Sequence, residues 1–114
     1  YHLEFQEKKG MAEIALKRIE AGKKTLEWVL AENPKRPVAL CNLGFAYALS
    51  GDLERAEQLY NQALALDPDY EQALVNKAAL LIYWKRNGEA KRLLERVLKM
   101  NPGNGQAKAA MDKL

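Results

Sequence analysis

The chain has 114 residues, 48% of them hydrophobic and 29% charged, with a net charge of +3, which is typical of one soluble domain and excludes a disordered segment. The longest strictly apolar run, residues 78–84, is far shorter than the roughly 18 residues that span a bilayer. One cysteine and one histidine exclude a disulfide framework and a Cys-rich zinc site, so the composition favours a binding or scaffold module over an enzyme and predicts no metal and no cofactor.

Apolar residues recur at intervals of three and four, the spacing of one face of a helix. In chain order the runs are Leu40, Leu43, Gly44, Tyr47 and Ala48; Leu53, Ala56, Leu59, Tyr60, Ala63 and Leu64; Leu74, Ala78, Leu81 and Ile82; and Ala90, Leu93, Leu94, Val97 and Leu98. No stretch alternates with period two, and alanine, leucine, glutamate and lysine dominate. The sequence therefore predicts an all-α fold.

Two kinds of helix break alternate along the chain. One is an Asn-Pro or Asp-Pro pair, repeated at equal intervals at Asn33-Pro34, Asp67-Pro68 and Asn101-Pro102. Proline disfavours helix in the residue before it, so helices should end near Leu30, Leu66 and Met100. The other is a tight turn at Gly51-Asp52 and at Asn87-Gly88, where glycine adopts the left-handed conformation easily and Asp52 can cap the next helix.

A repeat period of about 34 residues with paired helices resembles the tetratricopeptide repeat family. Residues 38–68 carry the resemblance best, since the family's W-x2-L-G-x2-Y, A-x3-F and P positions fall at Leu40, Leu43, Gly44, Tyr47, Ala56, Tyr60, Ala63 and Pro68. Leucine replaces the tryptophan of the pattern at residue 40. The next unit matches through Leu74, Ala78, Leu81, Ala90, Leu94, Val97 and Pro102, and departs at Lys77. The resemblance implies an α-solenoid that curves into a right-handed superhelix.

Residue size supports the pairing of helices. We expect the small residues Gly44 and Ala56 to let the two helices of the middle unit cross closely. We expect the large residues Tyr47 and Tyr60 to fill the space between units.

The ends of the array fit the pattern less well. Counting back one repeat period sets Gly10 against Gly44 and Leu26 against Tyr60, but polar residues stand at apolar positions: Gln6, Lys9 and Glu13. We expect residues 3–36 to form a degenerate capping repeat, or one longer first helix with its turn displaced toward Ala21-Gly22. The predicted organisation is a single domain over residues 1–114, with repeats at roughly 3–36, 37–70 and 71–104 and a capping helix at 105–114.

The resemblance implies that the first helices of the pairs form a concave face that binds a peptide or a helix. The candidate groove residues lie on these helices, outside the packing positions: Met11, Ile14, Val38, Cys41, Asn42, Phe45, Leu49, Gln72, Val75, Asn76, Ala79, Ile82 and Tyr83. Phe45 and Tyr83 are the large anchors. Two alternatives stay open: the asparagines make local hydrogen bonds between repeats, and the apolar residues pack against the next repeat.

One specialised ligand of this family is a chaperone C-terminus, whose two carboxylates are held by a clamp of lysine, arginine and asparagine side chains. Only Asn42, or Asn76 in a shifted register, fits that clamp here. Other residues stand where basic or amide groups are needed: Glu7, Met11, Cys41 and Gln72. The sequence therefore argues against a chaperone carboxylate clamp and favours a more apolar partner.

The predicted function is a noncatalytic protein–protein interaction scaffold whose partner is a protein or peptide. One alternative is an accessory module that docks other domains within a larger enzyme or multi-domain bacterial protein. A second is RNA binding through basic doublets such as Lys23-Lys24 and Lys91-Arg92, against which interleaved acidic residues and the modest net charge argue. Because the chain opens at Tyr1 and not at methionine, we expect it to be processed or cut from something longer. No signal-peptide pattern is visible, and a leader removed earlier would leave no trace.

Overall fold

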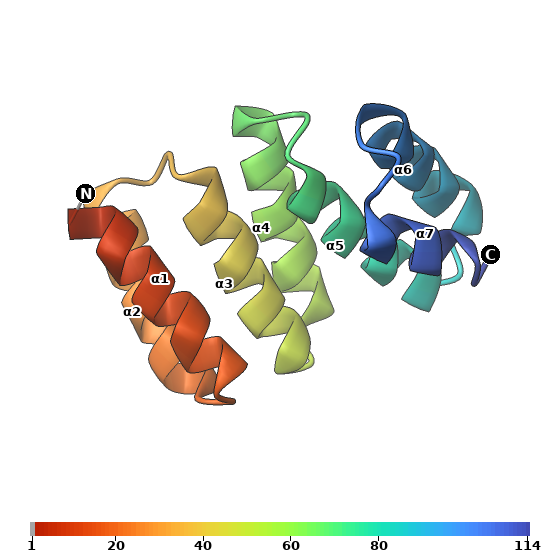
Figure 1. Ribbon diagram of the computed structural model, residues 1–114. Coiled ribbons are helices and arrows are strands. Elements are labelled where there is room, and N and C mark those ends of the chain that lie inside the picture. Colours follow the sequence, from red (N-terminus) through yellow and green to blue (C-terminus); the bar gives the residue numbers. More distant parts are fainter. Residues whose placement is uncertain (1) are drawn as a thin grey trace. The chain divides into compact units, whose positions relative to one another are not determined.

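The computed structural model describes residues 2–114, and over that range the chain folds into helices without a strand (Figure 1). The helices are α1 (His2–Ala15), α2 (Ile19–Glu32), α3 (Pro37–Leu49), α4 (Leu53–Leu66), α5 (Glu71–Tyr83), α6 (Asn87–Met100) and α7 (Gly105–Met111). They divide into two compact units, residues 1–68 and residues 69–114. The all-α prediction is confirmed.

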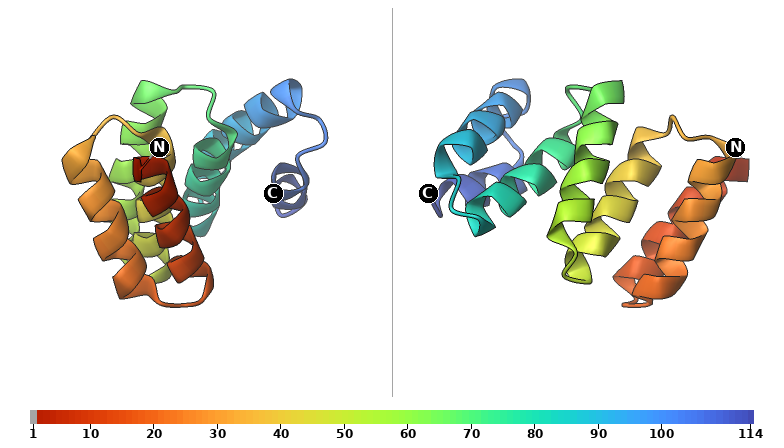
Figure 2. Two further views of the ribbon diagram at one scale, coloured as in Figure 1. Left: turned by 60° about the vertical axis from the view of Figure 1, so that its left-hand side comes forward. Right: turned by 180° about the vertical axis from the view of Figure 1, so that it is seen from behind.

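In the first unit, α1 pairs with α2 and α3 pairs with α4. The helices α1 and α3 run in the same direction, whereas α2 and α4 run back in the opposite direction (Figures 1 and 2). Contacts of α3 with both α1 and α2 join the two pairs into one core. The first helices of the two pairs therefore lie side by side on one face of this unit.

The proline breaks end helices as expected. The helices α4 and α6 end at Leu66 and Met100, and α2 continues two residues past the predicted end, to Glu32. Asp52 caps α4, since its Oδ1 accepts a hydrogen bond from the backbone N–H of Arg55 at 3.2 Å. Gly51 adopts a left-handed backbone with φ +89°, as the predicted turn requires.

The other two tight turns differ from the prediction. In the first unit the turn is not displaced toward Ala21-Gly22, because Lys17 supplies the left-handed residue with φ 65°. Before α6 the left-handed residue is Lys85, φ 61°, and Asn87-Gly88 already belongs to the helix. The prediction of a turn at Asn87-Gly88 and the alternative of a displaced first turn are therefore wrong, because lysine occupies the position equivalent to Gly51.

A shared hydrogen-bond pattern explains how lysine is tolerated there. The N–H of the residue after each left-handed position donates to a carbonyl five residues back: Arg18 to Glu13 at 2.8 Å, Asp52 to Tyr47 at 3.0 Å and Arg86 to Leu81 at 2.7 Å. This bond is the Schellman closure of a helix C-terminus. It offsets the roughly 1–2 kcal/mol that a side chain costs in a left-handed conformation.

Close packing within each pair depends on glycine. A Cβ added to Gly44 of α3 would lie 2.7 Å from the ring of Tyr60 on α4. Tyr60 is 1% exposed, and its ring fills the crossing of its own pair. The prediction placed this ring in the space between units. Tyr47 does lie between the pairs, where its hydroxyl donates to Glu27 of α2 at 3.2 Å.

The first pair repeats this arrangement. A Cβ added to Gly10 of α1 would lie 2.8 Å from the side chain of Leu26 on α2. These two residues precede Gly44 and Tyr60 by one repeat period, as the counting predicted. Residues 3–36 therefore contain a regular helix pair and not one longer first helix. One of its unexpected polar residues, Glu13, accepts a hydrogen bond from the Thr25 hydroxyl of α2 at 2.6 Å.

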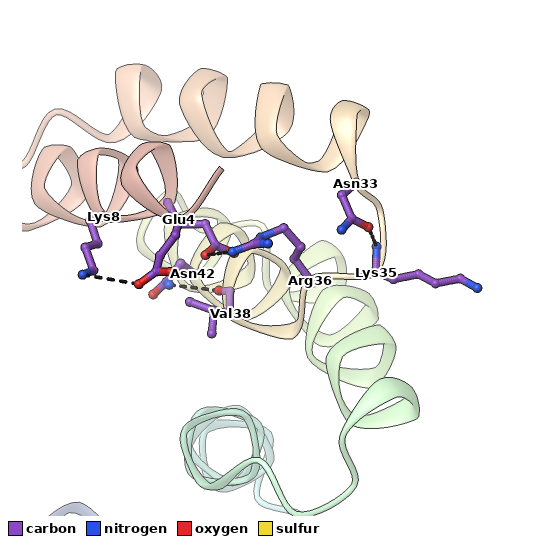
Figure 3. Close-up of polar contacts among 8 residues, drawn as sticks. Glu4, Lys8, Asn33, Lys35, Arg36, Val38 and Asn42 are labelled. Carbon is purple, nitrogen blue, oxygen red and sulfur yellow. Dashed lines mark hydrogen bonds and ion pairs between the residues drawn. The ribbon is translucent and has the colours of Figure 1, made fainter. Parts of the chain in front are cut away.

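A buried ion pair joins α1 to the start of α3. The Arg36 Nε and Nη2 atoms donate to the two carboxylate oxygens of Glu7 at 2.8 and 2.7 Å, and Glu7 is 4% exposed. Figure 3 labels Arg36, just before α3. The hydrogen bonds that the Arg36 guanidinium donates to Glu7 raise its pKa above the ordinary value. A bidentate charged pair of this kind fixes orientation as well as distance.

In the second unit, α7 packs against α5 and α6, with Ala107 fully buried. Asn104 caps α7 by accepting the backbone N–H of Ala107 at 2.9 Å. The Oε1 atom of Glu71, at the start of α5, accepts hydrogen bonds from the side-chain amides of Asn101 and Asn104 at 3.0 and 3.1 Å. These bonds attach the loop before α7 to α5.

Gly44→Ala tests the close crossing of α3 and α4. The new methyl group would meet a buried aromatic ring, so we expect a loss of about 1–3 kcal/mol in the free energy of unfolding, although alanine is the better helix former. Urea denaturation followed by circular dichroism measures it. Gly88→Ala is the matched control, because a Cβ there meets open space and should be neutral or stabilise by up to about 1 kcal/mol. Equal effects at both glycines would contradict the crossing as described.

Glu7→Ala tests the buried ion pair. It removes both acceptors of Arg36 and should cost about 1–3 kcal/mol of unfolding free energy, a range that allows for partial rescue of the guanidinium by water. Glu4→Ala is the control, since its ion pair with Lys8, at 3.6 Å, is exposed and should be worth less than about 0.5 kcal/mol. A Glu7→Ala protein as stable as the Glu4→Ala protein would contradict a structural role for the pair.

Candidate functional site

The first helices of the pairs share one row of accessible or half-buried side chains, spaced as a single helical face. On α3 the stripe consists of Val38, Asn42, Phe45 and Leu49. Its apolar members are partly accessible, with exposed fractions of 38% for Val38, 42% for Phe45 and 53% for Leu49. We call this set the α3 stripe.

The first helices of the other pairs repeat the stripe at an interval of one repeat period. The α1 stripe consists of Glu4, Lys8, Met11 and Ala15, and the α5 stripe, in the second unit, of Gln72, Asn76, Ala79 and Tyr83. Tyr83 is 73% exposed and Met11 is 43% exposed. The same positions of the period are thus accessible on all three helices.

Most of the predicted groove residues lie on these stripes, but four do not: Ile14, Cys41, Val75 and Ile82. Ile14, Cys41 and Val75 are core residues, with exposed fractions of 6%, 1% and 7%. Ile82 is half-buried. Residues 14, 41 and 75 are each one position from a stripe residue, and one position turns a side chain by about 100° around a helix. We therefore remove these three from the candidate surface.

Sequence reasoning missed the two polar residues of the α1 stripe, Glu4 and Lys8. Both precede stripe residues of α3 by one repeat period, so the period alone could have identified them.

Each of the two asparagines makes a hydrogen bond within its own helix. The Nδ2 atom of Asn42 donates to the Val38 carbonyl at 2.9 Å. Asn76 Oδ1 accepts a hydrogen bond from Gln72 Nε2 at 2.8 Å. The same Gln72 Nε2 atom donates to Gln106 Oε1 of α7 at 3.2 Å. Both amides stay accessible beside these bonds, on the N-terminal half of each stripe.

The stripes of the first unit divide into two zones. The N-terminal halves hold the polar residues Glu4, Lys8 and Asn42 together with Val38, and Arg36 directly precedes α3 (Figure 3). We call Glu4, Lys8, Arg36 and Asn42 the polar zone. Its charges are paired, Lys8 with Glu4 at 3.6 Å and Arg36 with Glu7 at 2.7 Å. The C-terminal halves form an apolar zone of Met11, Ala15, Phe45 and Leu49. The parallel course of α1 and α3 places like zones side by side (Figure 1).

A separate cavity of about 300 Å³ lies among α2, α3 and α4. It is lined by leucines, with charged or polar groups at its edge: Leu30, Leu40, Leu43 and Leu59, with Glu27, Arg55 and Gln62. Leu40 is the residue that replaces the tryptophan of the repeat pattern. The cavity does not include any residue of the α3 stripe, so the two surfaces are distinct.

Residues 2–114 contain neither a metal-binding cluster nor a membrane-spanning helix. No group of three or more histidine, cysteine, aspartate or glutamate side chains in that range could hold a metal ion. Over the same residues, no helix is both long and apolar enough to cross a membrane.

Known proteins share this architecture and part of the sequence. Human Protein O-mannosyl-transferase TMTC3 is 30% identical over 101 residues, which cover 89% of this chain and 11% of that protein. Photosystem I assembly protein Ycf3 of Acaryochloris marina is 38% identical over 63 residues, 54% of this chain and 38% of that protein. The chain thus spans about a tenth of TMTC3 and under half of Ycf3.

Solved structures agree over nearly the whole chain. The first TPR of Spaghetti (RPAP3), bound to the HSP90 peptide SRMEEVD, superposes with a TM-score of 0.89 at 25% identity, covering 97% of this chain and 88% of that one. The second TPR domain of human RPAP3, in complex with the HSP70 peptide SGPTIEEVD, gives 0.83 at 25% identity and covers 95% and 90%. Models of the Tetratricopeptide repeat family match residues 37–70 and 71–104. With consecutive repeats matched over more than half of its length, the chain belongs to the tetratricopeptide repeat family.

Proposed function

We propose that the chain is a noncatalytic interaction module that binds a protein or peptide on the exposed stripes of its first helices. The observation that carries the proposal is the accessibility of Phe45 and Leu49, two large apolar side chains one helical turn apart on the same face of α3. Contiguous exposed apolar surface on a folded protein commonly marks an interaction site. Peptide complexes of the RPAP3 domains, which share this fold, support the same type of function.

The chemistry of the stripes supports binding over catalysis. The side chains available are apolar groups and amides, together with charges that already have partners in salt bridges. Such groups suit burial against another protein surface, whereas proton transfer needs a titratable group placed to reach a substrate. These side chains also argue against a partner that binds through its terminal carboxylate, because the Arg36 guanidinium already donates to Glu7.

A neighbouring domain of a longer protein is a second candidate occupant. The observation in its favour is that this chain corresponds to only 11% of TMTC3, a much longer protein. The same apolar zone would then be covered within one chain and not by a separate partner. In a full-length protein, this candidate predicts that Phe45→Glu increases amide hydrogen exchange in α3 and in the docked domain.

Phe45→Glu tests the proposed binding surface. A carboxylate in the apolar zone must lose water when a partner covers it, so we expect binding to weaken at least about tenfold. The probes are peptides enriched from a randomised display library on the wild-type chain, with dissociation constants measured by fluorescence anisotropy.

Trp28→Glu is the matched control. Trp28 is also aromatic and mid-helix, with 44% exposure against 42% for Phe45, but it lies on the second helix α2. We expect its peptide affinity to stay within about twofold of wild type. Circular dichroism should show both variants folded, since both side chains are exposed. A folded Phe45→Glu protein with unchanged affinity would refute the assignment of the surface.

A further inference from the structure

The outward side of α6, in the second unit, is strongly basic. It is formed by five exposed residues at helical spacing: Gly88, Lys91, Arg92, Glu95 and Lys99. The opposite side of the helix is fully buried, at Ala90, Leu94 and Val97. We call the five exposed residues the α6 face. It carries three cations and one acid.

The other second helices do not share this charge. Counting back by one repeat period from the α6 face leads to α4, which has two acids and no base at these positions: Glu54, Glu57, Gln58, Asn61 and Ala65. Counting back once more leads to α2, where the charges balance: Glu20, Lys23, Lys24, Glu27 and Ala31. Residues 69–114 as a whole carry nine lysines and arginines against five acids, whereas residues 1–68 carry nine against ten. The positive charge of the chain is thus concentrated in the second unit.

Salt bridges do not neutralise the α6 face. The ion pairs around this helix use other cations, since Arg86 pairs with Glu89 at 2.9 Å and Arg96 pairs with Asp69 at 2.6 Å. Within residues 2–114, no salt bridge involves a residue of the α6 face. The hydrogen bonds from Arg86 lower the pKa of Glu89, and the charge of Arg92 lowers it further. The start of α6 therefore lies in a positive field.

Helix stability does not account for these cations. Lys99 lies in the last turn, where a cation complements the helix macrodipole. Lys91 and Arg92 lie in the N-terminal half, where the macrodipole gives a cation no advantage, and the matching residues of α4 are Glu57 and Gln58. A balanced face such as that of α2 would solvate the helix equally well. The excess of cations is therefore available for recognition.

We infer that the α6 face binds an acidic segment of a partner protein, as a second surface that does not depend on the first-helix stripes. Lys91 and Lys99 are about 12 Å apart along the helix axis, so carboxylates of one segment can pair with both ends of the face. Complementary charges of this kind give specificity and speed of association. Because the pairs are exposed, the affinity is modest and falls as salt is added.

A polynucleotide fits the same face less well. Glu95 lies between the cations and would meet an unbroken row of phosphates, which repel it. The α6 face also has no aromatic side chain on which a base could stack. A protein segment can place an uncharged or basic residue opposite Glu95 and its carboxylates on either side.

The test is a titration of the isotope-labelled chain, followed by NMR, with a capped peptide in which glutamate and alanine alternate. We expect the largest amide shift changes at residues 88–99. The dissociation constant should rise at least about threefold when salt is raised from about 50 mM to about 300 mM, since added ions screen exposed charges. The same peptide with glutamine in place of glutamate should not bind measurably.

Arg92→Glu and Lys24→Glu are the matched variants. The two residues occupy the same position of the repeat period, on α6 and on α2, and both are exposed. Both substitutions change the net charge by the same amount. We expect Arg92→Glu to weaken binding of the acidic peptide at least about fivefold and Lys24→Glu to leave it within about twofold. Circular dichroism should show both variants folded.

Several results would overturn the inference. Equal weakening by the two variants would mean that only net charge matters. Shift changes largest outside residues 88–99 would place the acidic peptide on another surface. An affinity that ignores salt, or no binding at about 50 mM salt, would remove the electrostatic basis of the site. An oligothymidylate that binds at least as tightly as the peptide would make nucleic acid the partner instead.

Discussion

Every helix pair of the first unit depends on a missing side chain where its two helices cross. Gly10 makes room for Leu26 and Gly44 makes room for Tyr60, with hypothetical Cβ atoms only 2.8 and 2.7 Å from these side chains. This contact fixes the rotation of the first helix about its axis. With Gly44 turned toward α4, its two neighbours are each rotated by about 100° around α3, in opposite senses. Leu43 is 3% exposed and Phe45 is 42% exposed, so the glycine crossing sets the rotation of α3 and the packing of α1 and α2 on it decides which neighbour stays accessible.

The repeat period predicted this arrangement even where the residue types changed. Gly10 and Leu26 follow from Gly44 and Tyr60 by counting back one period, although neighbouring positions in the first unit are polar. The turns show the limit of reasoning from residue type. Glycine marks the left-handed position at Gly51 only, and lysine takes that position at Lys17 and Lys85. The Schellman hydrogen bonds and packing on both sides determine the turn, and the residue type is secondary.

The binding face was harder to predict than the fold because burial depends on neighbouring helices. In the first unit α3 packs against α1, α2 and α4 together, so the buried arc of α3 is wide and its exposed stripe narrow. Cys41 and Phe45 are both apolar and both outside the repeat pattern, yet only Phe45 falls within the narrow stripe. No local sequence signal separates them. The repeat period separates them once one stripe is known, because every stripe occupies the same four positions of the period.

The Glu7–Arg36 pair connects the fold to the character of the surface. It joins α1 to the residue before α3 at the polar end of the stripes, so it helps to hold the two first helices in parallel. It also consumes a guanidinium that would otherwise attract an acidic partner to that end. Because the Arg36 charge is neutralised by Glu7, shape and apolar area are the properties by which this surface can distinguish one partner from another. A surface of this type recognises the pattern of apolar residues in its partner more than the charge of that partner.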